Sequence, residues 1–353
     1  MSPMGVVRIR GVALPDGDVV DLYADGDRWT TEPVANAELV GEGWLIPGLV
    51  DAHTHPGAEE PGDAFDEVSL REDLHRHVAA GVTLIRSPGL AGEAPAWYGV
   101  DHDVPRAVNA GPWISQHGQF FESWGTKATL AEMPFVAAEQ ARRTRWVKII
   151  VDWDAHDPVI PLPTMQLIVD AVHAAGAKIA VHSQHTEGSR VAVAAGVDSL
   201  EHGMSLDLDL LDQMATQGTA LAPTLAAFLS HMEEMRSMEM NERRRWFVRG
   251  ATAHPALTAA AFEAGVTILA GTDSHPTGTI GDEIRAIWCA GVPAHDALGA
   301  GSWVARRYLG YEGLVDGAPA DAVVYDRDPR IDLEELRSPR AIILRGEVRY
   351  RRD

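Results

Sequence analysis

Short apolar runs separated by longer amphipathic stretches make up most of this chain. From Trp44 onward, each apolar run stops at a polar residue or a turn. The stretches between the runs have helical spacing of apolar positions, and several end in Ala-Gly, which is a helix-stop signal. The run from Trp44 to Val50 is the first predicted strand of eight, and the other seven are Val82–Ile85, Trp113–Ser115, Trp146–Val151, Ile179–Val181, Val197–Leu200, Leu221–Ala222 and Val266–Ala270.

Strands that alternate with helices along a chain are typical of parallel sheets in α/β proteins. Eight such units predict a (β/α)8 TIM barrel in residues 44–309, with a doubly wound sheet as the alternative. Residues 1–43 and 310–353 contain short alternating strands and turns, and neither segment is large enough to hold a core by itself. We therefore expect both termini to build one small composite β-sandwich domain beside the barrel.

The composition limits the partners of the protein. The 51 acidic and 30 basic residues give a net charge of −21, which argues against nucleic acid or an anionic membrane as a partner. Cys289 is the only cysteine, so an internal disulfide and a thiolate metal cage are excluded.

The first seven residues lack an apolar segment of signal-peptide length, and no apolar run reaches about 18 residues. We expect a cytoplasmic protein, and a homo-oligomer stays an open alternative.

Polar residues at the ends of the predicted strands form a set that suits a metal ion. His53 and His55 are spaced i, i+2, so on a strand they point to the same face. Because the carboxyl ends of barrel strands converge on one face, we expect polar residues at these ends to lie together. Imidazole and carboxylate groups together suit zinc or a similar divalent ion. The other strand-end residues are Lys148, His182, His202 and Asp273.

Each of these residues also has a structural explanation. The histidines could be solvated loop residues or barrel-rim residues, and Asp273 could cap the helix that follows it. Lys148 could extend its amine out of the strand end into solvent. A lysine amine is a poor metal ligand, but its carbamate with CO2 is an anionic ligand that could bridge two ions. The position of all six residues at or near strand ends favours the metal site.

With this set of strand-end residues, the chain resembles the amidohydrolase superfamily over essentially its whole length. The resemblance is closest to the imidazolonepropionase-like and prolidase-like branch of that superfamily. The motifs that carry it occur in this order: Pro47–His55, Gly81–Thr83, Val147–Ile149, Val181–His182, Ala195–Gly203, Pro223–Leu225, Ala270–Asp273 and Gly317–Val324.

The resemblance implies a metal-dependent hydrolase that cleaves a carbon–nitrogen bond of a small molecule. Members similar to this sequence commonly hold two divalent ions, and zinc is the expected metal. The implied ligands are His53, His55 and Asp273 for the more buried ion, His182 and His202 for the more exposed ion, and a carboxylated Lys148 that bridges the two.

The same resemblance implies a mechanism. A hydroxide between the ions would be the nucleophile, since a bound divalent metal lowers the pKa of water towards neutrality. Asp273 would accept its proton and deliver it to the leaving nitrogen, and the exposed ion would polarise the substrate carbonyl. The expected bond is an amide in a dipeptide-like, N-acylated or cyclic compound. The alternatives are a mononuclear metal deaminase of the same superfamily and a non-catalytic barrel that serves as a binding module.

The loops that follow the strands differ from those of the branch, so the resemblance does not define the substrate. The differences lie in residues 116–124, 152–157, 183–185 and 274–276. Trp124 and Trp153 could form an aromatic wall or simply pack the loops on the barrel, and loop histidines could simply be solvated. The substrate contacts expected in these loops are His117, Phe120, Trp153, His185 and His275.

Overall fold

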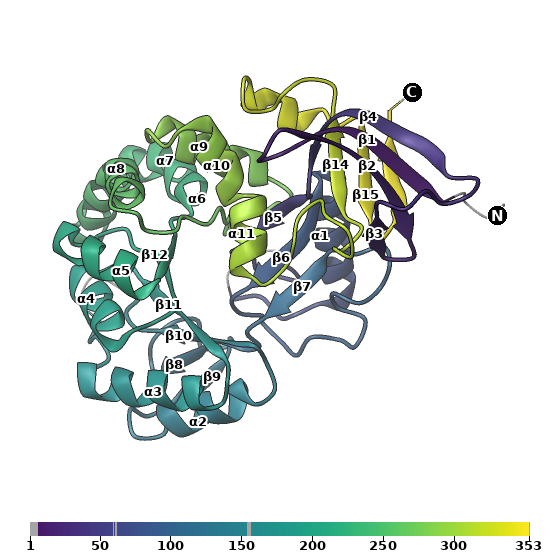
Figure 1. Cartoon of the computed structure of the whole chain (residues 1–353). Helices are drawn as coiled ribbons and strands as arrows, with labels where there is room; N and C mark the ends of the chain where they lie inside the picture. Colours follow the sequence, from purple (N-terminus) through teal and green to yellow (C-terminus); the bar gives the residue numbers. More distant parts are fainter. Residues whose placement is uncertain (1–5, 59, 61, 154–156, 353) are drawn as a thin grey trace.

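Parallel β-sheets surrounded by helices lie beside a further sheet that is built from the two ends of the chain (Figure 1). The computed structural model describes residues 6–58, 60, 62–153 and 157–352. The predicted α/β class with parallel sheets is therefore confirmed. Every helix in the described part of the chain is too short or too polar to cross a membrane.

Strands from both ends of the chain meet in one seven-stranded sheet. β4 lies at its centre, parallel to β1 from the N-terminal segment and antiparallel to β14 from the C-terminal segment. Ile9, Leu45 and Ile343 belong to a buried core that serves this sheet. β4 continues without a break through the boundary predicted between residues 43 and 44. From edge to edge the sheet contains β16 (Glu347–Arg351), β15 (Ala341–Leu344), β14 (Ala322–Tyr325), β4 (Glu38–Ile46), β1 (Val7–Ala13), β2 (Asp18–Asp25) and β3 (Arg28–Thr30).

The remaining strands form two parallel sheets. Many of them are buried along their whole length, which is expected when helices cover one face and side chains fill the other. The smaller sheet contains β5 (Leu49–Asp51), β6 (Val82–Ser87) and β7 (Arg106–Asn109). The larger sheet contains, in spatial order, β13 (Ala220–Ala222), β12 (Ser199–His202), β11 (Lys178–Ser183), β10 (Trp146–Ile150), β8 (Ile114–Gln116) and β9 (Thr126–Ala128).

Two of the predicted strands differ from the observed ones. The prediction at Trp113–Ser115 corresponds to β8, but β7 precedes it and pairs with β6, while β8 pairs with β10. β7 was missed because its sequence, Arg-Ala-Val-Asn, has only a weak apolar pattern. The apolar run at Val266–Ala270 has one isolated bridge, from Leu221 to Ile268. It still exchanges hydrogen bonds with its neighbours, because Leu269 N donates to Leu221 O at 2.9 Å and Ala52 N donates to Ala270 O at 2.8 Å.

Helices connect and cover the strands, and their ends follow the sequence signals. Asp66 caps the first helix by accepting from Ser69 N, and Gly196, with a φ of 83°, ends the helix before β12. The helices are α1 (Glu67–Ala79), α2 (Met133–Ala141), α3 (Leu162–Ala174), α4 (Thr186–Ala195), α5 (Leu211–Gln217), α6 (Leu225–Ser230), α7 (Met232–Ser237), α8 (Glu242–Glu263), α9 (Ile280–Cys289), α10 (Ala294–Ala300) and α11 (Trp303–Tyr308), with short 3-10 turns at Leu208–Leu210 and Leu333–Arg337.

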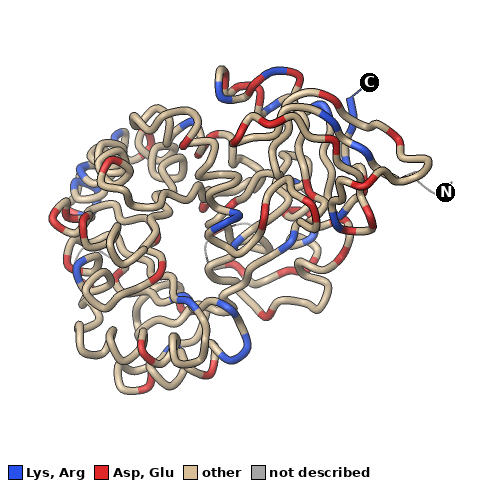
Figure 2. Tube along the Cα trace, viewed as in Figure 1, with Lys and Arg blue, Asp and Glu red and all other residues tan. Residues whose placement is uncertain are grey.

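A buried ion-pair network joins the terminal sheet to the parallel sheets. Asp321, just before β14, accepts from Arg306 and from Arg106, each at 2.9 Å. Arg306 also donates to Thr83 on β6 at 2.9 Å. Burial tends to raise the pKa of Asp321, but the two guanidinium groups hold it below its ordinary value. Elsewhere acidic and basic residues are interspersed along the outer helices and loops (Figure 2).

Candidate metal centre

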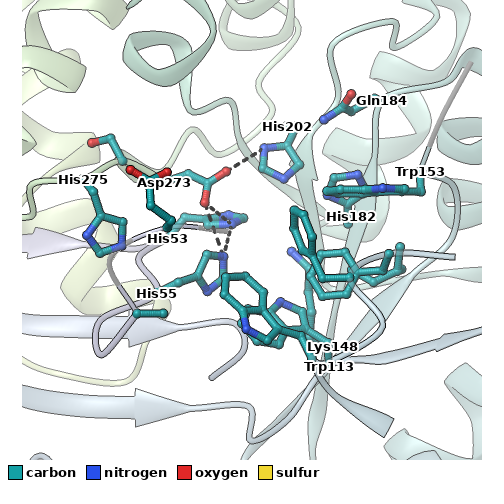
Figure 3. A pocket seen from close by; sticks show the side chains of 17 residues that line it. His53, His55, Trp113, Lys148, Trp153, His182, Gln184, His202, Asp273 and His275 are labelled. Carbon is teal, nitrogen blue, oxygen red and sulfur yellow. Dashed lines mark hydrogen bonds and ion pairs between the residues drawn. The ribbon is translucent and has the colours of Figure 1, made fainter. Parts of the chain in front are cut away.

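One cavity of about 190 Å³ is lined by all six side chains that the sequence predicts as metal ligands. Most of them project from the carboxyl ends of parallel strands, and Figure 3 shows them gathered around a common space. Their positions are His53 and His55 after β5, Lys148 within β10, His182 within β11, His202 at the end of β12, and Asp273 after the 266–270 run.

The hydrogen bonds of His53 and His55 fix which ring nitrogen carries the proton. The Nδ1 atom of His53 lies 2.6 Å from a carboxylate oxygen of Glu201, and that of His55 lies 2.8 Å from the carbonyl of Gly89. Both partners are acceptors, so each Nδ1 must be the protonated nitrogen. Each Nε2 then carries a lone pair, and the two Nε2 atoms face each other at 3.1 Å. Two nitrogens on one tetrahedral zinc ion, each at about 2.0–2.1 Å, lie about 3.3 Å apart.

Lys148 and His182 bring unsatisfied polar atoms to the same cavity. Within the described part of the chain, neither Lys148 Nζ nor His182 Nε2 has a hydrogen-bond partner, although both atoms are buried. Burial lowers the pKa of Lys148 to about 8 and that of His182 well below its ordinary value. Buried polar atoms without partners are costly, so a bound ion or a modification of the lysine would satisfy them.

Asp273 completes the set opposite the histidines. One carboxylate oxygen lies 3.4 Å from His55 Nε2 and 3.8 Å from His53 Nε2, and the other lies 3.8 Å from His202 Nδ1. Ligand atoms of His53, His202 and Asp273 fall within 4.8 Å of one another. The ring of His182 lies 4.6 Å from that of His202. His53, His202 and Asp273 therefore fit a divalent ion in donor type and in spacing.

The backbone at this site is held in an unusual conformation. His202 and Asp273 have φ values of 68° and 45°, in the left-handed region that non-glycine residues rarely adopt. Thr224, with a φ of 50°, places its hydroxyl 2.8 Å from His202 Nδ1. Asp51 accepts from the backbone and hydroxyl of Thr272 at 3.0 and 2.7 Å. These contacts position His202 and Asp273 and offset the local strain.

A buried ion pair beneath the cavity was not predicted. Arg86 on β6 donates to both carboxylate oxygens of Glu201 at 2.8 and 2.9 Å, and to Ala52 O at 2.6 Å. Burial tends to raise the pKa of Glu201, but Arg86 and Lys148 outweigh burial and lower it. The sequence signals only that a charged residue beside each apolar run needs a partner when it is buried, and it does not identify that partner.

The sequence matches the model of the amidohydrolase family over residues 44–348. The chain belongs to the amidohydrolase family. A protein of Mycobacterium tuberculosis, "Uncharacterized protein Rv2915c", is 34% identical over 372 residues, which cover 97% of this chain and 95% of that one. The predicted resemblance is confirmed.

Solved structures of other proteins share the fold of this amidohydrolase. A Xaa-Pro dipeptidase with bound methionine in its active site matches with a TM-score of 0.83 at 21% identity, over 98% of this chain and 100% of that chain. Ochratoxinase from Aspergillus niger matches with a TM-score of 0.80 at 19% identity, over 98% and 96% of the two chains. This amidohydrolase is a hydrolase that acts on carbon–nitrogen bonds, and its family generally uses divalent metal ions.

The predicted substrate contacts divide into two groups. Phe120, Trp153 and His275 line the cavity. His117 is exposed and His185 packs its ring 5.0 Å from that of Trp246, so neither belongs to the cavity lining in the described chain. Lining residues that the sequence did not single out are Ala58, Glu60, Trp113, Phe121, Ile150, Gln184 and Ser274. Most of them lie in or next to the diverged loops, where a substrate-facing position was the only available signal.

Proposed function

We propose that this amidohydrolase hydrolyses an amide bond in a dipeptide-like, N-acylated or cyclic small molecule, with two zinc ions as cofactors. One observation carries the proposal. The lone pairs of His53 Nε2 and His55 Nε2 face each other at 3.1 Å, beside the Asp273 carboxylate. Two lone pairs repel at that distance unless a cation lies between them, so the pair is built for a metal ion.

We also propose that the two parallel sheets belong to one closed (β/α)8 barrel of residues 44–309. Residues 266–273 supply the link on one side, because Leu221 bridges Ile268 and Ala52 N donates to Ala270 O at 2.8 Å. Residues 110–113 supply the link on the other side, between β7 and β8. The segments 1–43 and 310–353 then form the small β-sandwich domain. A barrel would direct the strand ends that carry the six side chains to one face.

Lys148 is proposed to act as a carboxylated bridging ligand. Its pKa of about 8, lowered by burial, leaves part of the amine neutral near neutral pH. A neutral amine adds to CO2 and releases one proton, which gives a carbamate whose single negative charge is shared by two oxygens. The carbamate would satisfy the buried Nζ position and add negative charge among four histidines. His53, His55 and Asp273 would hold the more buried ion, and His182 and His202 the more exposed one.

Asp273 is proposed to move the proton. When bound, the ions supply Lewis acidity, which lowers the pKa of water and polarises a substrate carbonyl. Burial raises the pKa of Asp273 to about 7, and a nearby cation would lower it again. The Asp273 carboxylate, beside the histidines, can accept a proton and then release it to the leaving nitrogen. The hydrogen bond from Asp273 N to His53 O, at 2.8 Å, holds the carboxylate beside the histidines.

The class of substrate rests on the relatives and on the cavity. Solved relatives are named as a Xaa-Pro dipeptidase, a prolidase and ochratoxinase, and the first two names favour a dipeptide-like amide. The cavity of about 190 Å³ has room for a small molecule and is too small to admit a folded protein. A small-molecule substrate is therefore favoured.

The test is hydrolysis by protein that has been produced with zinc and bicarbonate. A panel of dipeptides, N-acyl amino acids and cyclic amides would be assayed for release of the free amine. We expect turnover of at least one class, loss of turnover after metal removal by a chelator, and recovery on return of zinc. Turnover that survives complete removal of metal would contradict the proposal.

A further inference from the structure

Five aromatic side chains form a continuous wall along one side of the cavity. The ring of Phe120 lies 5.3 Å from that of Trp113 and 4.9 Å from that of Trp153. The ring of Phe121 lies 5.0 Å from that of Trp124 and 5.1 Å from that of Trp153. At one end Trp113 lies 4.9 Å from His55, and at the other end Trp153 lies 5.2 Å from His182. This aromatic wall therefore extends from His55 to His182, and it consists of Trp113, Phe120, Phe121, Trp124 and Trp153.

The wall has a packed back and an open front. Trp113 and Trp124 stack at 4.9 Å with nearly parallel rings and are only 2% and 6% exposed. Phe120, Phe121 and Trp153 are partly exposed and line the cavity. Aromatic faces left open towards a cavity gain free energy when an apolar group covers them. The front of the wall is therefore a surface that a ligand can cover.

Lys127 fixes the front of the wall in place. Its ammonium group donates to Gln119 O at 3.1 Å, to Phe121 O at 2.7 Å and to Ser115 Oγ at 3.0 Å. These bonds use all three of its donors. They enclose Phe120, which has a φ of 61° in the left-handed region and a ring 5.4 Å from the ammonium. A residue in the left-handed region, with both neighbouring carbonyls held by one lysine next to a cavity, is typical of a functional position.

The opposite side of the cavity is polar. Figure 3 shows His275 and Trp153 on opposite sides of the site, and the polar side chains of Glu60 and Ser274 also line the cavity. The cavity of about 190 Å³ is small. A protein cavity of about 150 Å³ is enough to bind one benzene molecule. The space therefore suits one ring beside the reacting group, with the polar end of the molecule turned towards His275.

We propose that the aromatic wall is a subsite for a single aromatic ring of the substrate, attached close to the bond that is cleaved. The proposal rests on the proposed function, since it names the substrate class of the same site. An aromatic ring is favoured over an aliphatic ring of equal size because edge and face contacts with the wall add to the gain from burial. Lys127 is a positioning residue that acts through Phe120 and Phe121.

The test compares three hydroxamic acids that carry the same metal-binding group. Dissociation constants of acetohydroxamic, phenylacetohydroxamic and cyclohexylacetohydroxamic acid would be measured by calorimetry on the zinc-loaded protein. We expect phenylacetohydroxamic acid to bind at least tenfold more tightly than acetohydroxamic acid, and more tightly than the cyclohexyl compound. Equal affinity of the phenyl and methyl compounds would overturn the subsite, and so would equal or tighter binding of the cyclohexyl compound.

Variants assign the effect to the wall. Phe121→Ala and Trp153→Ala should each reduce the tenfold preference for phenylacetohydroxamic acid over acetohydroxamic acid to about twofold or less. Lys127→Met should reduce the same preference and leave the zinc content unchanged. A general structural defect would lower the zinc content as well. Phe135→Ala is the matched control, because Phe135 lies on α2 and is 70% exposed. A preference that survives both wall variants would overturn the assignment.

The same measurements separate this proposal from the proposed function. If acetohydroxamic acid does not bind and the protein holds no zinc, the metal centre is wrong. Binding of phenylacetohydroxamic acid that persists in that case would still support the subsite. If neither compound binds, the subsite is overturned as well.

Discussion

The buried carboxylate of Glu201 accepts a hydrogen bond from Nδ1 of His53 at 2.6 Å. Both side chains are inaccessible to solvent. The bond selects the His53 tautomer with its free lone pair on Nε2, which faces the cavity. A carboxylate that orients a ligand imidazole in this way strengthens metal binding. Glu201 thus connects its buried ion pair with Arg86 to the candidate metal centre.

Replacement of Glu201 by glutamine should weaken zinc binding by about 10–100-fold, because the ligand His53 loses its anionic partner. The measurement is the zinc dissociation constant in competition with a chromophoric chelator, under conditions where the variant is folded. Glu187→Gln is a surface control on α4 and should bind zinc as the wild type does. Unchanged zinc affinity of the Glu201 variant would show that Glu201 does not strengthen metal binding through His53.

Replacement of Asp321 by asparagine should lower the free energy of unfolding by about 3–5 kcal/mol, because it leaves Arg306 and Arg106 with a missing buried partner. Urea denaturation measures the loss. The zinc affinity should stay the same, since Asp321 does not line the cavity in the described chain. This variant is also the control for Glu201→Gln, because both break a buried pair with arginine. A loss of zinc affinity here would mean that destabilisation alone explains the first result.

Replacement of Asp273 by asparagine should lower kcat by about 10²–10⁴-fold, because an amide cannot accept and return a proton. The rate should be measured at saturating zinc, so that loss of a ligand does not limit it. Asp170→Asn, at an exposed position on α3, is the matched control and should keep full activity. Activity within a few-fold of the wild type would exclude Asp273 as the proton carrier.

His254 should make stability depend on pH below about 6.5. Burial lowers the pKa of His254 to about 4 from an ordinary value of 6.5, and its Nε2–H donates to Pro223 O at 2.8 Å. Between these pH values the unfolded chain binds more protons than the folded one. Stability from this group is therefore complete above about 6.5 and falls with decreasing pH, by up to about 1.4 kcal/mol per pH unit, until about pH 4.

The pH effect can be isolated by comparison with His254→Phe. The variant keeps the size of the ring and the contact with Phe228, whose ring lies 5.4 Å from that of His254. The free energy of unfolding would be measured by denaturant at several pH values from 4 to 7. The wild-type curve should be steeper than the variant curve in this range. Parallel curves would mean that His254 is not held neutral.

The strand-end residues of the site were predictable because their signal is local. His53 and His55 follow an apolar run with the period of a strand, and Lys148 interrupts another apolar run. Parallel strand ends meet on one face whatever the loops do, so residues far apart in the sequence could be grouped without knowledge of their contacts. The structure brings these residues to one cavity.

The supporting contacts were not predictable because they depend on pairing between distant strands. Arg86 and Glu201 are 115 positions apart, and the local sequence around each residue does not indicate that the two form an ion pair. Thr224 contacts His202 from a left-handed backbone conformation, and a sequence pattern does not specify that conformation for threonine.

The loops were the least predictable part of the site. His185 and Trp153 both follow a parallel strand and looked alike in the sequence. Trp153 lines the cavity, whereas the ring of His185 lies beside Trp246 on α8. Loop packing of this kind depends on side chains from other elements, so a strand-end position alone does not decide which residues face the substrate.

The metal content of wild-type protein and of Lys148→Ala tests the central claim most directly. Both would be produced with zinc and bicarbonate and measured by elemental analysis alongside activity. Lys178→Ala is the control, because Lys178 is exposed at the opposite end of the neighbouring strand β11. We predict about two zinc ions per wild-type and control chain, and fewer than two with loss of activity in Lys148→Ala. Full metal content and activity in Lys148→Ala, or a metal-free wild type, would contradict the account.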